Sequence, residues 1–212
     1  MCLWKKKNKR RCTVAVSPAF LALLLVFAAA DRQRLLVHIL LAAAVHEAGH
    51  AAAVHLAGGE IALFRITLFG AEMRIRRSER LSYGREILSV LAGPGVNLLC
   101  ALVLGRAAGA LDWEAGYAAA GVHAALALFN LLPVRPLDGG RIFYLLLCWR
   151  VEPVTAERAM GRIDRAFLCA ALFGTALLQG MTGPQLPLLM LELWFIFCWC
   201  RETGIVKPLR TG

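Results

Sequence analysis

Charged residues are scarce in this sequence of 212 residues. Asp, Glu, Lys and Arg together make up 18% of it, whereas hydrophobic residues make up 59%. Soluble globular domains are typically about 25% charged and about 45–50% apolar. The shortage of charge excludes an ordinary soluble domain, and apolar runs approaching the length of a membrane span recur along the chain. We therefore expect one polytopic membrane domain with no separate soluble domain.

The cysteines lack the spacing of a metal or redox motif. Seven are scattered along the chain, and Cys100, Cys169 and Cys198 fall inside apolar runs, where a free cysteine packs as a small hydrophobic residue. A single residue separates Cys198 from Cys200, which fits neither a zinc site nor a thioredoxin-like motif. We interpret the cysteines as packing residues.

Acidic residues are few compared with basic ones, 14 against 24, which gives a formal net charge of +10. Such a charge can indicate nucleic-acid binding, but here the basic residues gather at the ends of apolar runs. They are numerous in 5–11, 65–85, 135–165 and 201–210, and sparse in the alternate connections. Because Lys and Arg favour the cytoplasmic side, this asymmetry predicts six spanning helices with both termini in the cytoplasm, and no nucleic-acid partner.

Six apolar runs are predicted to form the membrane-spanning helices. They are residues 14–30, 35–57, 87–104, 116–132, 166–178 and 185–200. The first run follows a basic block and ends in small residues, so a cleaved signal peptide is the alternative to an uncleaved helix. Its length is just sufficient to span, which favours the uncleaved helix. Residues 142–149 are too few to span, and 150–165 resembles an amphipathic surface segment.

The segment 60–76 differs from these runs in its period. Its residues alternate on either side of Gly70, a pattern typical of a β-hairpin. Both faces are partly apolar, so we expect the hairpin at the membrane surface or in a protein cavity, because an open strand edge cannot face lipid. The sequence thus predicts an all-α polytopic membrane protein of about six transmembrane helices, with a small membrane-associated β-hairpin after the second.

Three polar residues occupy the centre of the second apolar run. His46, Glu47 and His50 form an H-E-x-x-H pattern, which on a helix places the two imidazoles one turn apart on one face. Histidines with this spacing bind Zn²⁺, with the glutamate beside them as general base. The alternative is a chance pentapeptide, but three polar groups without partners would be costly inside a membrane.

A catalytic zinc site usually takes a third protein ligand. Asp138 is the best remaining oxygen donor, because its Pro- and Gly-rich segment follows a helix that ends on the same side as the second run. Asp-Gly is also a common turn pair, so a solvated turn aspartate is the alternative. His123 lies seven residues before Asn130 and shares its helix face. His123 is therefore a candidate for supporting a ligand or lining a substrate path, and helix packing is its alternative.

These residues belong to three motifs that resemble the signatures of the site-2 protease family of intramembrane zinc metalloproteases. The motifs are H-E-A-G-H at 46–50, G-P-G-V-N at 93–97 and F-N-L-L-P-V-R-P-L-D-G-G-R at 129–141. The I-T-L-F-G hairpin at 66–70 is similar to that of the branch containing the sporulation protease that processes pro-sigma-K.

The resemblance implies a role for each matching residue. His46, His50 and Asp138 would bind one zinc ion, and Glu47 would be catalytic. Asn130 and Asn97 would hold an unfolded substrate segment or polarise its carbonyl group.

The resemblance also implies an organisation. Residues 1–34 would hold a basic segment and the first helix, 35–141 the metalloprotease core, and 142–212 an amphipathic segment, the last two helices and a short tail. The PDZ and CBS domains of many relatives are not expected, so nucleotide control of the CBS kind is not expected either.

The implied reaction is hydrolysis of a peptide bond in a membrane-associated protein, in or near the cytoplasmic side of a bacterial-type cell membrane. The expected partners are the lipid bilayer, a substrate with a transmembrane segment, such as a sporulation sigma-factor precursor, and membrane regulatory proteins. A helical substrate would have to unwind, and an edge strand of the hairpin could pair with it.

Two other functions remain open on the sequence. A catalytically silent membrane adaptor could retain a zinc site, although Glu47 argues against it because a structural site needs no water-activating carboxylate. A metal transporter should carry ionisable residues on several helices, whereas here they concentrate on one helix and one loop.

Overall fold

A computed structural model describes residues 13–31, 34–67, 70–76, 82–183 and 185–202 of the chain. The basic block at 5–11, the arginines at 77 and 80 and the tail beyond 202 lie outside the described residues. The described part is mostly helical, with one small sheet.

Helices form in all six predicted runs. The described helices are α1 (Pro18–Ala30), α2 (Leu35–Leu56), α3 (Tyr83–Leu111), α4 (Glu114–Asn130), α5 (Asp138–Arg150), α6 (Pro153–Thr182) and α7 (Leu186–Glu202). Among them, α2, α3 and α6 are long and apolar enough to span a membrane, and Phe20–Ala29 and Leu188–Cys200 are shorter apolar helical segments. Large apolar side chains also face outward, including Leu25, Leu99 and Phe173, exposed by 71%, 60% and 73%. Such a surface suits lipid better than water.

Several of the predicted boundaries were wrong. Residues 14–16 form a strand rather than the start of a helix, because β-branched Thr13, Val14 and Val16 favour extended backbone and α1 begins only at Pro18. The separate amphipathic segment is absent, since α6 runs unbroken from Pro153 with no further proline before Thr182. Asp138 is the first residue of α5 and does not lie in a loop.

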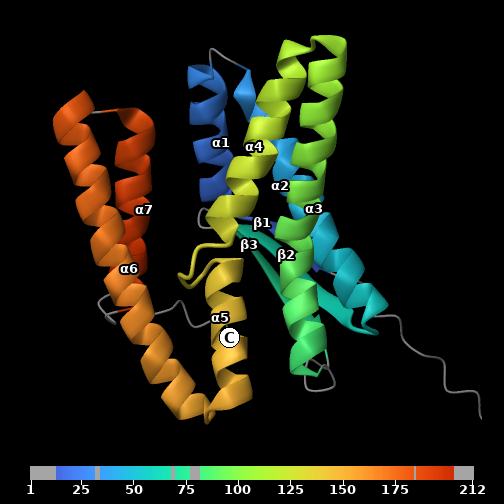
Figure 1. Cartoon of the computed structure of the whole chain (residues 1–212), viewed down its shortest axis with the longest axis vertical. Coiled ribbons are helices and arrows are strands. Elements are labelled where there is room, and N and C mark those ends of the chain that lie inside the picture. Colours follow the sequence, from blue (N-terminus) through green and yellow to red (C-terminus); the bar gives the residue numbers. More distant parts are fainter. Residues whose placement is uncertain (1–12, 32–33, 68–69, 77–81, 184, 203–212) are drawn as a thin grey trace, which may run out of the picture.

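The predicted hairpin is confirmed and gains a third strand. Strands β2 (Glu60–Thr67) and β3 (Gly70–Arg76) pair antiparallel, and β1 (Thr13–Val16) pairs parallel with β2. The strand order is β1-β2-β3, so β2 is central and β3 forms the outer edge on the hairpin side. Figure 1 shows the sheet at the level where α4 ends and α5 begins.

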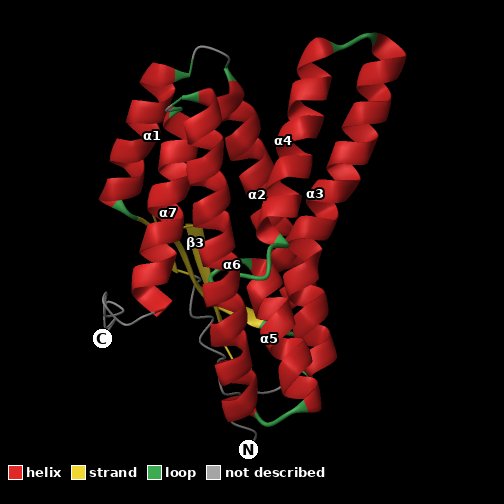
Figure 2. Cartoon of the chain, turned by 60° about the vertical axis from the view of Figure 1, so that its left-hand side comes forward, coloured by secondary structure: helices red, strands yellow, loops and turns green. Residues whose placement is uncertain are grey.

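The helices form two packed groups. Helix α3 packs against α2, α4 and α5, and α6 packs against α5 and α7. Helices α6 and α7 form a hairpin beside the others (Figures 1 and 2). A buried cluster joins this hairpin to the segment between α4 and α5. Its members are Val134, Leu137, Leu168, Phe195 and Cys198.

Candidate metal centre

Two glycines bring α2 and α3 into close contact where the histidines lie. A Cβ atom added at Gly49 would lie 2.8 Å from the carbonyl oxygen of Ala92. A Cβ atom added at Gly93 would collide with the ring of His50. Small residues let membrane helices approach closely, so these two positions allow the His50 ring to fit between the helices.

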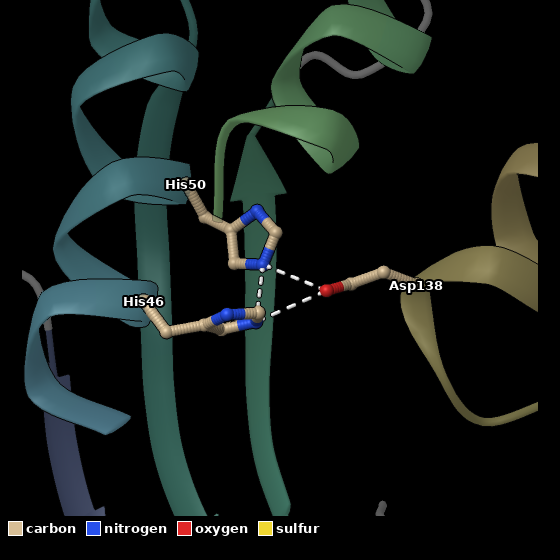
Figure 3. Close-up of side chains that lie close together, drawn as sticks. All are labelled: His46, His50 and Asp138. Carbon is tan, nitrogen blue, oxygen red and sulfur yellow. Dashed lines mark hydrogen bonds and ion pairs between the residues drawn. The ribbon is translucent and has the colours of Figure 1, made fainter. Parts of the chain in front are cut away.

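His46 and His50 project from α2 toward Asp138 at the start of α5 (Figure 3). The Nε2 atoms of His46 and His50 lie 3.0 and 3.2 Å from Oδ2 of Asp138, and 3.1 Å from each other. The two imidazole rings meet at 85°. Three ligand atoms therefore converge on one point, although Asp138 lies 92 positions after His46 and 88 after His50.

This arrangement fits a zinc ion. Ligand atoms at zinc-bond lengths of about 2.0–2.1 Å and tetrahedral angles lie about 3.3 Å apart, close to the three separations of 3.0, 3.1 and 3.2 Å. Two imidazole nitrogens and one carboxylate oxygen are a donor set typical of catalytic zinc. His46, His50 and Asp138 could therefore hold one zinc ion with small adjustments.

Asp138 is positioned by tight backbone packing. Cβ atoms at Gly139 and Gly140 would collide with the backbone of Leu131 and Val134, so only glycine allows α5 to begin directly beneath the preceding segment. Burial alone would raise the pKa of the Asp138 carboxyl, but the hydrogen bonds with His46 and His50 outweigh it and hold the pKa below its usual value. The carboxyl is thereby kept in the ionised form that binds a metal.

Each histidine is contacted on its other ring nitrogen as well. His50 Nδ1 lies 2.9 Å from the carbonyl oxygen of Ser89, so it donates its proton there and leaves Nε2 to accept a metal. His46 Nδ1 lies 3.4 Å from Nδ2 of Asn97. Oδ1 of Asn97 lies 3.1 Å from Nδ1 of His123.

The candidate metal ligands open onto a cavity of about 740 Å³ that Glu47 and Asn130 also line. The amide of Asn130 donates to the carbonyl of Leu126, 2.9 Å away. Most of the remaining lining is apolar and comes from α1, α2, the sheet, α4 and α7. It includes Phe20, Ile39, Leu40, Phe64, Ile66, Met73, Phe129 and Trp194.

The structure thus separates the sequence-predicted residues into two groups. His46, His50, Asp138, Glu47 and Asn130 gather at the cavity. Asn97, exposed by 0%, contacts His46 on its Nδ1 side instead, and His123, exposed by 6%, contacts Asn97.

Sequence reasoning missed the attachment of the Asp138 segment to α6. Asp164, with none of its side chain exposed, accepts hydrogen bonds from the backbone N–H and from Nε of Arg135, at 3.1 and 2.7 Å. Glu157 forms a second ion pair with Arg135. In the sequence, the one indication was that Asp164 lies between arginines at the start of an apolar run. This pattern does not identify Arg135 as its partner.

Comparisons with known proteins find similarity to peptidases. Residues 106–171 match the model of peptidase family M50. Over 167 residues the chain is 26% identical to "Putative zinc metalloprotease Rip3" of Mycobacterium tuberculosis, in a match that covers 74% of this chain and 42% of that protein. The chain therefore matches less than half the length of this curated relative.

A solved structure shares the fold. The site-2 protease from Methanocaldococcus jannaschii superposes with a TM-score of 0.66 at 19% identity, over 92% of this chain and 90% of that one. These findings confirm the resemblance to the site-2 protease and M50 family. The finer resemblance to the pro-sigma-K branch stays a prediction.

Proposed function

We propose that this chain, which has the site-2 protease fold, is an intramembrane zinc metalloprotease. One observation carries the proposal: His46, His50 and Asp138 converge within 3.0–3.2 Å on the wall of an apolar cavity that also contains Glu47. The resemblance to zinc metalloproteases supports it. The convergence alone would also fit a structural zinc site, and Glu47 distinguishes the two.

The chain's own residues supply the remaining chemistry. A zinc ion held by His46, His50 and Asp138 would lower the pKa of a bound water to about 7 and would polarise a carbonyl group. Glu47 takes the proton of the attacking water and returns it to the leaving amine. Asn130 presents both a donor and an acceptor, which matches the two polar groups of a substrate peptide bond. One hydrogen of the Asn130 amide is donated to the carbonyl oxygen of Leu126. The other hydrogen and the Oδ1 atom bind the substrate.

The substrate is an apolar, extended segment of a membrane protein. A helix hides its carbonyl groups in its own hydrogen bonds, so a transmembrane substrate must unwind before cleavage. The cavity borders the sheet through Phe64, Ile66, Thr67 and Met73. Because β2 is already paired on both sides, the unwound segment would pair with an outer strand. Of the two outer strands, β3 contributes Met73 to the cavity lining, so β3 is the strand that could pair with it.

The membrane arrangement follows from the basic residues. Six helices cross the membrane with both termini in the cytoplasm, and α2 runs inward so that the site lies toward the cytoplasmic side. The cell membrane is of the bacterial type, and membrane regulatory proteins control access. A sporulation sigma-factor precursor is one candidate substrate and an anti-sigma factor is another.

The test is the variant Glu47→Gln, co-expressed with candidate substrates and compared with the unmodified chain. We expect loss of substrate cleavage with an unchanged zinc content, because Glu47 removes a proton and is not a ligand. Cleavage by the variant at the normal rate would show that Glu47 is not the base. An unmodified chain that binds zinc and substrate but cleaves nothing would favour the silent adaptor.

A further inference from the structure

A line of buried polar side chains lies behind the metal ligand His46. It joins three helices, with His46 on α2, Asn97 on α3 and His123 on α4. Their exposed fractions are 5%, 0% and 6%. Asn97 lies between the two histidines. Its Nδ2 atom is 3.4 Å from Nδ1 of His46, and its Oδ1 atom is 3.1 Å from Nδ1 of His123. Buried polar side chains are costly unless hydrogen-bonded, so the direction of each bond in this line matters.

Metal binding decides the first of these directions. A metal at Nε2 of His46 uses the lone pair of that nitrogen, so the ring proton must sit on Nδ1, which becomes a donor. In the structure, the amide nitrogen Nδ2 of Asn97 faces Nδ1 of His46. An amide nitrogen cannot accept that proton. The oxygen and nitrogen of a side-chain amide have nearly the same shape, so a half-turn of the amide brings Oδ1 to His46 without moving the helices.

The second direction follows from the first. After the half-turn, Nδ2 of Asn97 faces Nδ1 of His123 and donates to it. Nδ1 of His123 must then carry a lone pair, and its ring proton lies on Nε2. The contact between His46 and Asn97 and the contact between Asn97 and His123 both join a donor to an acceptor only when these two orientations are set together. His46 differs here from His50, whose Nδ1 is satisfied by the backbone carbonyl of Ser89.

We propose that Asn97 and His123 are positioning residues for the metal ligand His46. Asn97 accepts the Nδ1 proton of His46, and His123 holds the Asn97 amide in the orientation that does so. Together they keep Nε2 of His46 directed at the metal. This inference rests on the metal site of the proposed function. It gives Asn97 and His123 a role separate from substrate binding, which falls to Asn130.

The test measures zinc affinity in the purified full chain by competition with a chromogenic chelator. Asn97→Leu removes the acceptor at nearly constant volume, and we expect zinc affinity about 10–100-fold weaker, the usual effect of losing such a partner. Asn97→Asp keeps an acceptor for His46 and should restore most of the affinity. His123→Phe should fall between the two. Thr175→Val is the matched control, because Thr175 is buried but bonds only to its own helix.

A second measurement reads the line directly in the unmodified chain. In ¹⁵N-histidine-labelled protein with zinc bound, Nδ1 of His123 should show the shift of an unprotonated ring nitrogen, and Nδ1 of His46 that of a protonated one. A protonated Nδ1 on His123 would overturn the inference, even if the variants failed to fold. Wild-type zinc affinity in a folded Asn97→Leu would overturn it too.

The failure of this inference is distinguishable from failure of the proposed function. An unmodified chain that binds zinc but cleaves no substrate would leave the positioning role intact, since neither readout depends on cleavage. An unmodified chain that binds no zinc would overturn both the positioning role and the metalloprotease.

Discussion

The close contact of Gly93 with the ring of His50 gives a quantitative prediction for Gly93→Ala. The added Cβ would lie 2.6 Å from Cε1 and 2.9 Å from Cδ2 of the ring, where ordinary contacts begin at 3.4 Å. The ring must therefore retreat by nearly 1 Å or the helices must separate. Metal-ligand distances tolerate only about 0.2 Å, and the bond from His50 to Ser89 would be strained as well.

Overpacking of this kind costs about 1–3 kcal/mol, and about 1.4 kcal/mol corresponds to a tenfold change in an equilibrium constant. We expect the Gly93→Ala chain to bind zinc roughly 5- to 150-fold more weakly, as measured by chelator competition on the purified chain.

Gly95→Ala is the matched control, two residues along the same helix. A Cβ at Gly95 would meet nothing within 4 Å, so zinc affinity should be unchanged and the helix slightly more stable, since alanine favours helices over glycine by about 1 kcal/mol. Equal zinc affinity in Gly93→Ala and the unmodified chain, or equal losses in both variants, would refute the reasoning.

Two further predictions concern the segment before Asp138 and the sheet. Arg135→Met should lower the free energy of unfolding by about 3–5 kcal/mol, because it removes the main charge partner of the fully buried Asp164. Arg135→Met/Asp164→Leu should recover much of that loss in calorimetry, and no recovery would show that the ion pair is not the cause. Met73→Pro and Arg74→Pro test pairing by β3, whose N–H groups point alternately toward and away from β2. Proline at the position whose N–H points away from β2 removes no hydrogen bond within the sheet, so that variant should keep the fold and lose cleavage. Full cleavage by every variant that folds would exclude pairing of the substrate with β3.

Local spacing made much of the centre predictable from the sequence. The i, i+4 spacing of His46 and His50 places both on one helix face in any helix. Their position inside an apolar run indicates function, because polar groups are costly there. The hairpin was predictable for a similar reason, since alternation on either side of Gly70 is a local property. Asp138 was the best candidate for a third ligand by its chemistry and its expected side of the membrane, and the structure places it beside the two histidines.

The tertiary structure alone decided how these local features meet. Spacing sets the face on which a residue lies, but the rotation and crossing of two helices depend on packing between distant residues. The contact of Gly93 with His50 and the line from His46 through Asn97 to His123 arise only when α2, α3 and α4 pack together. The pairing of β1 with β2 and the attachment of Arg135 to Asp164 likewise join distant segments. Local spacing and chemistry identify the residues that can bind zinc, whereas packing between distant segments decides which side chains lie against them.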